Sequence, residues 1–407
     1  MRTVWIAAIA GAALVAGAVG LTVISGRDDS ARDTGRVDAT MADAESAYAD
    51  LEYERVAEIL TGLAEQGVPL AQYRLGLMYR VGQGVDVDED AAVLWLSRAV
   101  GREYAPARAP LGEIYLARAE RAATPAAGVP WYEQAADLGQ VDAQAVLGSY
   151  YLTGIEVGQD TARGIALLTE AAEAGDLRAQ SNLGYAYTSG TGVAADDEAA
   201  FRWYLAAAEG GLVRAQAAVG LFYETGRGTE VNLPEAIRWY LNANAAGAPG
   251  TGARLGRLAI TGVLDGRNAV ELTRWVADAA RADVDGAVEW LEAAAEDGNP
   301  AVLNQLAGFY EAGEVLPQNS ALALENYRRA AQAGSADAQL ALARRYATGN
   351  GVTQDYVQAH VWANLAAAAG VPGAADERTL FAQFLSPEDL ALAQARATAW
   401  RADHREP

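Results

Sequence analysis

The sequence predicts an all-α protein, an α/α superhelical solenoid of about eight 36-residue helix-turn-helix repeats with capping helices at both ends. Three observations predict it. A glycine recurs at a constant spacing, apolar residues flank it at helical intervals, and turn residues separate the two apolar stripes of each copy. A constant period of this kind is typical of stacked repeats, in which each unit packs only on its neighbours.

The repeat is anchored by one position, which we call the register position. It follows a Leu or Val and recurs every 36 residues in six copies: Gly76, Gly112, Gly148, Gly184, Gly220 and Gly256. Two later copies have alanine there, Ala307 and Ala343. The residue before it and the tyrosine three after it lie four apart and so share one helix face. The missing side chain lets a partner helix approach, although glycine costs about 0.5–1 kcal/mol of helix stability.

A turn and a second helix follow each first helix. Glycines six residues after the register position suit the left-handed residue that ends a helix: Gly82, Gly154, Gly190, Gly226, Gly262, Gly313 and Gly349. Asp or Asn twelve residues after it suits the N-cap of the second helix: Asp88, Asp160, Asp196, Asn232, Asn268, Asn319 and Asp355. Trp-Tyr and Ala-Ala pairs then predict a buried stripe, with Tyr187 and Trp203 in the core of the fourth copy.

Two copies depart from this pattern. In the second, Arg118 and Glu120 replace the turn glycines, and Pro130 precedes a tryptophan. Because proline inside a helix costs about 3 kcal/mol, we expect the first helix to continue towards residue 122 and the second to begin late, near Pro130. The other departure is an insertion of 15 residues before Ala307. It predicts an extra helix within about 276–297, spanning roughly Val284–Glu296, with Asp283 at the N-cap spacing.

These patterns divide the chain into five parts. Residues 1–26 form a transmembrane anchor or signal segment, 27–40 a flexible polar linker and 41–370 the repeats, which begin with a capping helical pair. Residues 371–385 are expected to be a linker after a Gly-Val-Pro-Gly stop. Residues 386–407 form a C-terminal capping helix and tail, because Ser-Pro-Glu-Asp is a strong helix start.

The N-terminal segment Val4–Ser25 carries no charge over 22 residues. At 1.5 Å per residue it reaches about 33 Å, enough to cross a bilayer core. A cleaved signal peptide is the alternative, with Ala16–Ala18 as its cleavage site, although the segment is long for that role. Basic residues after the segment favour a cytoplasmic C-terminal side, whereas long domains translocate largely regardless of charge. We expect the inner membrane with the repeats in the periplasm, or a periplasmic protein after cleavage.

Composition excludes several classes of function. The net charge is -22 and all 31 basic residues are arginine, which argues against general nucleic-acid binding. No cysteine is present, so thiolate catalysis and zinc–cysteine sites are excluded. The Gly-x-Gly pairs follow helices and lack the lysine of a phosphate loop, and only two histidines exist. We therefore expect a non-enzymatic protein with no catalytic residues, cofactor or bound metal.

The pattern A-x-x-x-L-G-x-x-Y-x-x-G-x-G-V-x-x-D-x-x-x-A-x-x-W-Y-x-x-A-A resembles the Sel-one-like repeat (SLR), a relative of the tetratricopeptide repeat. Residues Ala179–Ala208 match it at nearly every position, and Ala71–Ala99 and Ala215–Ala246 match it closely. The resemblance covers about 42–370. It implies a solenoid that mediates protein–protein contacts, often as an adaptor in bacterial envelope assembly, signalling or stress pathways. The motif residues are structural in that family, so the resemblance implies no catalytic role for them.

The predicted function is therefore a scaffold that binds a protein or peptide along the solenoid groove. Candidate contact residues lie opposite the apolar stripe of the first helices, two or three residues before the register position or one after it: Tyr73, Arg74, Asn182, Tyr185, Arg254, Arg257 and Gln305. Ordinary solvated surface is the alternative interpretation of these residues, since few contacts dominate binding energy. A cell-wall or polysaccharide-associated factor and a cytoplasmic regulatory adaptor remain alternative functions.

Overall fold

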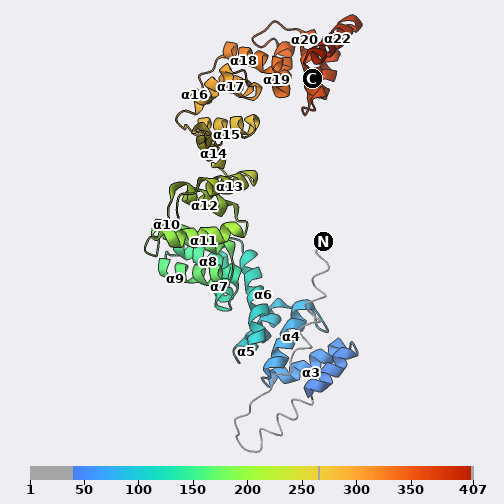
Figure 1. Cartoon of the computed structure of the whole chain (residues 1–407). Helices are drawn as coiled ribbons and strands as arrows, with labels where there is room; N and C mark the ends of the chain where they lie inside the picture. The colour runs from blue at the N-terminus through green and yellow to red at the C-terminus, as the bar shows by residue number, and fades with distance from the viewer. Residues whose placement is uncertain (1–39, 265, 405–407) are drawn as a thin grey trace, which may run out of the picture. The chain divides into compact units, whose positions relative to one another are not determined.

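A computed structural model describes residues 40–264 and 266–404 (Figure 1). Within these ranges the regular structure is entirely helical, as the repeat pattern predicted. The predicted anchor or signal segment and nearly all of the polar linker lie outside the described residues. Across 40–264 and 266–404, no helix is both long and apolar enough to cross a membrane.

The chain divides into two compact units, Met1–Gln159 and Asp160–Pro407. In the first unit, a helical segment at 40–49 precedes the repeats. The elements that follow are α3 (Tyr53–Glu65), α4 (Pro69–Val81), α5 (Glu89–Val100), the 3-10 helix η1 (Ala105–Ala107), α6 (Arg108–Glu120), α7 (Pro125–Asp137) and α8 (Val141–Thr153). Helices α4, α6 and α8 are first helices of repeats, and α5 and α7 are second helices.

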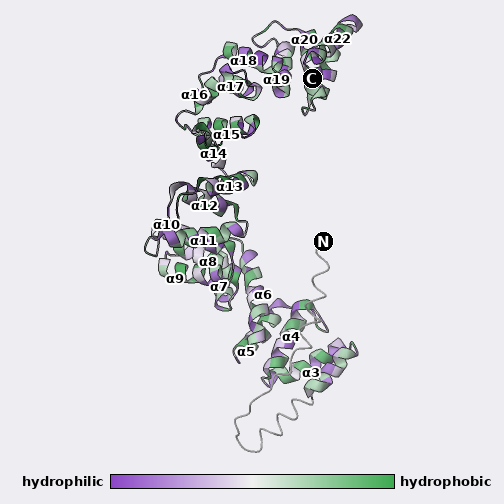
Figure 2. Cartoon of the chain, in the orientation of Figure 1, coloured by the Kyte–Doolittle hydropathy of each residue, from purple (hydrophilic) through white to green (hydrophobic). Residues whose placement is uncertain are grey.

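The second unit continues the alternation of first and second helices. Its helices are α9 (Thr161–Glu173), α10 (Leu177–Ser189), α11 (Asp197–Glu209), α12 (Val213–Thr225), α13 (Leu233–Ala245), α14 (Thr251–Ile260), α15 (Ala269–Arg281), α16 (Ala287–Glu296), α17 (Pro300–Ala312), α18 (Ser320–Gln332), α19 (Ala336–Thr348), α20 (Tyr356–Ala368), α21 (Ala374–Ala382) and α22 (Pro387–Asp403). Figure 2 shows hydrophobic and hydrophilic residues together on these helices, as expected when each buries one face.

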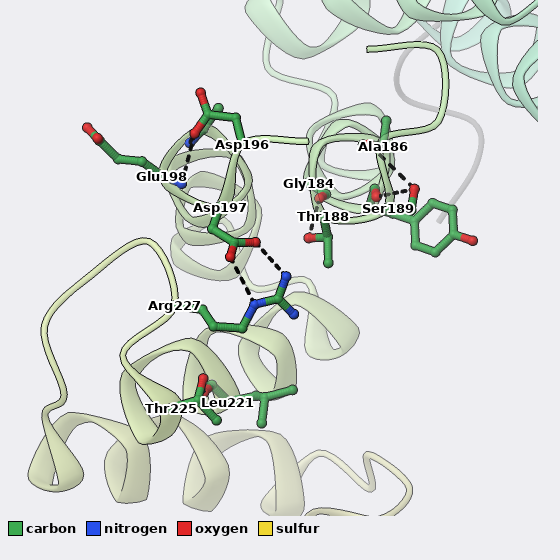
Figure 3. Close-up of polar contacts among 12 residues, drawn as sticks. Gly184, Ala186, Thr188, Ser189, Asp196, Asp197, Glu198, Leu221, Thr225 and Arg227 are labelled. Atoms are coloured by element: carbon green, nitrogen blue, oxygen red, sulfur yellow. Dashed lines mark hydrogen bonds and ion pairs between the residues drawn. The ribbon is translucent and has the colours of Figure 1, made fainter. Parts of the chain in front are cut away.

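The predicted helix ends are confirmed in six of the seven copies, whereas α14 ends at Ile260 with Thr261, and not Gly262, as its C-cap. Gly190 ends α10 with a φ of 73°, and the N–H groups of Glu198 and Ala199 donate to Asp196 Oδ1 at 3.0 Å at the start of α11 (Figure 3). The same left-handed glycine ends five more first helices: Gly82, Gly154, Gly226, Gly313 and Gly349. The other predicted caps also accept backbone N–H groups: Asp88, Asp160, Asn232, Asn268, Asn319 and Asp355.

The register glycines allow close contact between the two helices of a repeat. A Cβ atom placed on Gly184 would lie 2.8 Å from the Tyr204 ring, and one on Gly220 would lie 2.7 Å from the Tyr240 ring. These distances are shorter than van der Waals contact, so a larger residue would force the helices apart. The predicted role of the register glycine is confirmed at these two positions and at Gly76 and Gly256, whereas a Cβ on Gly112 would meet Gln140, which lies outside the partner helix. Trp203 and Tyr187, which were predicted to lie in the core, are only half-buried.

The second glycine of the turn joins one repeat to the next. Gly228 has a φ of 60°, and a Cβ there would overlap the Asp197 carbonyl at the start of α11. Beside it, the Arg227 guanidinium binds the Asp197 carboxylate with Nε–Oδ2 and Nη2–Oδ1 distances of 3.1 and 2.5 Å (Figure 3). Gly192 approaches Thr161 at the start of α9 in the same way. The turn therefore packs on the start of the preceding second helix.

The second repeat begins its second helix earlier than the sequence predicted. Helix α7 begins at Pro125, and Thr124 Oγ1 accepts the Ala127 N–H at 3.2 Å. Pro130 lies inside this helix, so the expected late start is wrong. Thr124 and Pro125 form a strong N-cap and first-turn pair, and the burial of Ala135 and Ala136 stabilises the helix beyond Pro130, which cannot make its backbone hydrogen bond.

The segment expected to be a linker at 371–385 contains helix α21. Phe381 of α21 is buried with Ala347 and Ala359, and the Arg344 guanidinium binds Glu377 with an Nη2–Oε1 distance of 2.6 Å. Packing on the last repeat thus stabilises a nine-residue helix that is too short to be stable alone.

The closing helix α22 covers the last repeat, as predicted. Ser386 Oγ accepts the Asp389 N–H at 3.1 Å, so the helix begins at the expected cap. Ala393 and Ala397 are fully buried against Val361 and Leu365 of α20. This contact shields apolar surface that no further repeat covers.

The inserted residues form α16, which begins three residues after the expected start. Leu291 of α16 is fully buried in the core of the second unit. Asp283 is not its N-cap, because Gly286 takes that position with a φ of 81° and no side-chain cap. Asp283 instead has a φ of 55° in the preceding turn.

We expect Gly184→Leu to lower the free energy of unfolding by about 1–3 kcal/mol, because the new side chain overlaps the Tyr204 ring. Gly308 is the matched control, since a Cβ there meets nothing within 4 Å. Gly308→Leu should not lower stability and should raise it by about 0.5–1 kcal/mol, because it replaces a glycine inside a helix. Urea denaturation followed by circular dichroism measures both, and equal stability of the two variants would contradict the packing role of Gly184.

Candidate interaction surface

The candidate contact residues share one surface of the repeats, which we call the first-helix face. It consists of the residues two or three before the register position and one after it on each first helix. Helices α4, α10, α14 and α17 carry all seven predicted residues. None of the seven is fully buried, and Tyr185 is the most accessible aromatic residue among them, with 57% of its surface exposed.

In the first unit, both predicted residues contact neighbouring elements. The Tyr73 and Tyr104 rings have centroids 5.5 Å apart, and burial raises the pKa of Tyr73. Arg74 Nη2 lies 3.1 Å from Glu45 Oε1, and only 12% of the Arg74 side chain is exposed. These contacts tie α4 to the capping helix at 40–49 and to the segment after α5.

In the second unit, Asn182 takes part in a contact between consecutive first helices. Arg214 of α12 donates from Nη2 to Asn182 Oδ1 at 2.9 Å and from Nε to Ser181 Oγ at 3.0 Å. Arg214 Nη2 also donates to the Arg178 carbonyl at 3.3 Å. The surface of α10 beside Tyr185 is thus held against α12 by one guanidinium.

Arg254 and Arg257 share a carboxylate that the sequence did not single out. Arg257 Nη2 donates to Glu224 Oε1, and Arg254 Nη1 lies 3.6 Å from Glu224 Oε2. Tyr240, which is fully buried, donates its hydroxyl to Glu224 Oε2 at 2.6 Å. Burial and then the Glu224 carboxylate raise the pKa of Tyr240 well above its usual value of 10. Only 9% of the Glu224 side chain is exposed.

The same arrangement occurs a second time. Tyr327 donates to Glu311 Oε2 at 2.8 Å, and Arg345 Nη2 donates to Glu311 Oε1 at 2.6 Å. Each glutamate lies four residues after its register position and each tyrosine twenty after it. Comparison of the copies gives only a partial signal for this Tyr–Glu pair, because Tyr132 and Tyr204 occupy the tyrosine position without a glutamate at the other position.

The structure brings four of the predicted residues together. Asn182 and Tyr185 of α10 and Arg254 and Arg257 of α14 flank α12, which binds both helices through Arg214 and Glu224. Tyr73 and Arg74 belong to the other unit, and half-buried Gln305 lies on α17, beyond the inserted α16.

The first-helix face offers polar and aromatic side chains for contact. Within 40–264 and 266–404, no group of three or more His, Cys, Asp or Glu side chains is placed to hold a metal ion. His360, in α20, is 3% exposed, and burial followed by the Arg378 charge lowers its pKa. It lies on a second helix and not on the first-helix face.

Stacked helix pairs with an exposed first-helix face define an α-solenoid repeat protein. The family model described as "Sel1 repeat" matches more than half of the chain, so the chain belongs to the Sel1 repeat family. Its matches cover 69–100, 126–140, 141–176, 177–212, 213–247, 278–299, 300–335 and 336–371. The gaps at 101–125 and 248–277 coincide with the two copies that depart from the pattern. Proteins of this family are generally protein-interaction scaffolds, and the fold is typically non-enzymatic.

Two solved structures are similar to this chain over most of its length, and one relative is similar over a short segment. A Sel1 repeat protein from Oxalobacter formigenes is 25% identical over 89% of this chain and 98% of that chain, with a TM-score of 0.42. The protective antigen c5321 of uropathogenic Escherichia coli, which has an SLR fold, is 24% identical over 90% of this chain and 94% of that chain, with a TM-score of 0.41. An uncharacterized protein of Neisseria meningitidis serogroup B is 49% identical over 53 residues, 13% of this chain and 11% of that protein.

We expect Tyr240→Phe to lower the free energy of unfolding at neutral pH by about 1–3 kcal/mol, because it removes a hydrogen bond to a charged group. The raised pKa of Tyr240 keeps its hydroxyl protonated in the folded chain, so stability is lost as the pH rises above 10 and the unfolded chain ionises. Tyr240→Phe should reduce this loss of stability at alkaline pH. Urea titrations between neutral pH and about pH 11 measure both effects, as that range spans the ordinary tyrosine pKa.

The control is Tyr185→Phe, which removes an exposed hydroxyl and should leave stability at neutral pH within about 0.5 kcal/mol of the parent. If both substitutions had the same effect at neutral pH, the Tyr240–Glu224 hydrogen bond would not stabilise the repeat.

Proposed function

We propose that this protein is a non-enzymatic scaffold that binds a protein or peptide along the first-helix face of the second unit. The observation that carries the proposal is the exposure of Tyr185 on α10, a helix that Arg214 holds against the next first helix, α12. Exposed tyrosines are efficient anchors in protein interfaces, because a large rigid ring contributes contact area at little cost in entropy. Membership in the Sel1 repeat family supports the same function.

We further propose that the scaffold is exported to a bacterial cell envelope, with the N-terminal segment as a membrane tether or cleaved signal. The support is the composition of Val4–Ser25, which is uncharged and long enough to span a bilayer core. The functional consequence is that the partner would be an envelope protein or a peptide exposed in that compartment.

Photo-crosslinking tests the binding face. We expect a benzoylphenylalanine at Tyr185 to crosslink one defined partner in the native cell, because that side chain is exposed on the first-helix face. The matched control is Val270, which is 64% exposed on α15, a second helix. Crosslinked products are identified by mass spectrometry. Identical products at both positions, or none at Tyr185, would contradict binding at this face.

Reporter fusions test the export proposal. Alkaline phosphatase, which is active only after export, is fused after Arg36 and, separately, after Pro407. Both fusions should be active, and β-lactamase fusions at the same positions should protect cells from ampicillin. Inactive fusions at both positions would instead place the repeats in the cytoplasm and support a regulatory adaptor.

A further inference from the structure

The Glu224 site contains more positive than negative charge. Arg254 and Arg257 both bind the Glu224 carboxylate, and Tyr240, its third partner, donates a neutral hydroxyl. Two guanidinium groups therefore share one carboxylate, which leaves one positive charge in excess. This excess occurs in a chain whose net charge is -22.

Two other ion pairs of the second unit are matched in charge. Arg344 binds Glu377 through both Nε and Nη2, at 2.6–3.1 Å, and Arg345 binds Glu311. In each pair, one guanidinium is neutralised by one carboxylate. Arg344 occupies the same position after the register residue as Arg257, so the two arginines differ mainly in this balance.

The excess charge is accessible. The Arg254 side chain is 38% exposed and the Arg257 side chain 49%, whereas Glu224 is 9% exposed. A guanidinium has five N–H donors, and a carboxylate has about four lone-pair sites, of which the Tyr240 hydroxyl already uses one. The two guanidiniums thus present more donors than Glu224 can accept, and both side chains are partly exposed to solvent.

Apolar and aromatic residues continue this surface along the neighbouring helices. Tyr185, Leu221 and Arg257 occupy the same register position on α10, α12 and α14. Leu221 is half-buried and Tyr185 exposed. The contacts of Arg214 with α10 and of Arg257 with Glu224 show that these three helices are consecutive neighbours. The surface therefore runs from an aromatic residue through an aliphatic one to a pair of arginines.

We propose that Arg254 and Arg257 bind a carboxylate of an extended peptide segment of a protein partner, and that Tyr185 and Leu221 contact an apolar residue of that segment. This inference rests on the proposed scaffold function and specifies the chemistry of its ligand. Helix axes packed about 8–10 Å apart separate α10 from α14 by roughly 20 Å, so the carboxylate and the apolar residue are about six extended residues apart.

The overall charge limits what kind of peptide fits. A strongly acidic partner would be repelled by a chain with a net charge of -22. A single carboxylate in an otherwise neutral, apolar segment avoids that repulsion and still gains charge-assisted hydrogen bonds from two guanidiniums. The chemistry is therefore that of one acidic side chain or a free C-terminal carboxylate.

The test uses the full-length chain and synthetic peptides carrying a neutral fluorophore. Each peptide has one tryptophan and one aspartate about six residues apart in a glycine–serine background, with both ends blocked. A matched peptide has asparagine for aspartate, and another has a free C-terminal carboxylate as its only acid. We expect the parent chain to bind the best carboxylate peptide at least about tenfold more tightly than the asparagine peptide, as measured by fluorescence anisotropy.

Substitutions test whether the two arginines cause the preference for the carboxylate peptides over the asparagine peptide. Arg254→Gln with Arg257→Gln should abolish the preference, whereas Arg344→Gln, whose arginine is already neutralised, should keep it. Glu224→Gln removes the competing carboxylate and retains an acceptor for Tyr240, so it should strengthen binding of the carboxylate peptides. No preference in the parent chain, an equal loss in Arg344→Gln, or weaker binding in Glu224→Gln would overturn the proposal.

The same variants separate this inference from the proposed function. If the chain with Arg254→Gln and Arg257→Gln still crosslinks its partner at Tyr185 with undiminished yield, the scaffold function stands and the carboxylate site is wrong. If no partner is crosslinked at Tyr185 in the parent chain while the peptide preference depends on the arginines, the carboxylate site stands and the proposed binding face for the native partner is wrong.

Discussion

Close contact between the two helices of a repeat is the constraint on which the rest of the structure depends. In two copies the aromatic ring from the second helix lies directly over the register glycine of the first, as Tyr240 does over Gly220. Glycine permits this close approach, and alanine, the smallest side chain, holds the position in the copy where Tyr327 binds Glu311. The contact also directs the tyrosine hydroxyl to the residue four positions further along the first helix, where Glu224 accepts its hydrogen bond. Packing within one repeat thereby positions the group that binds the next.

Contacts between neighbouring helices use all three arginine side chains that the sequence offered as binding residues. Arg74, Arg254 and Arg257 all bind glutamates of neighbouring helices. Such pairs hold adjacent repeats in a defined relation, although exposed ion pairs add little stability individually. Some polar residues of the first-helix face therefore already have partners within the protein. Recognition therefore depends on the groups that these ion pairs do not use, namely the exposed ring of Tyr185 and the excess positive charge near Glu224.

Local sequence signals failed where two of them competed or where packing decided the outcome. Pro130 looked like the start of a helix, but the cap formed by Thr124 and Pro125 acts five residues earlier. The segment that became α21 follows two helix-breaking residues and is too short to be helical alone. Its helix exists because Phe381 is buried and Glu377 binds Arg344. Both contacts are made with the preceding repeat, so they cannot be predicted from the sequence of α21 and its immediate neighbours.

The amino-acid sequence by itself determined the helix pairs, the turns between them and the Sel1 repeat class. These depend on residues close together in the chain, such as Gly190 ending one helix and Asp196 capping the next. Only the tertiary structure decided which polar residues of the first-helix face are paired. Glu224 and Arg257 are 33 residues apart, and they meet because stacking of whole repeats places consecutive first helices side by side. Electrostatic balance at that surface is therefore a property of the assembled repeats.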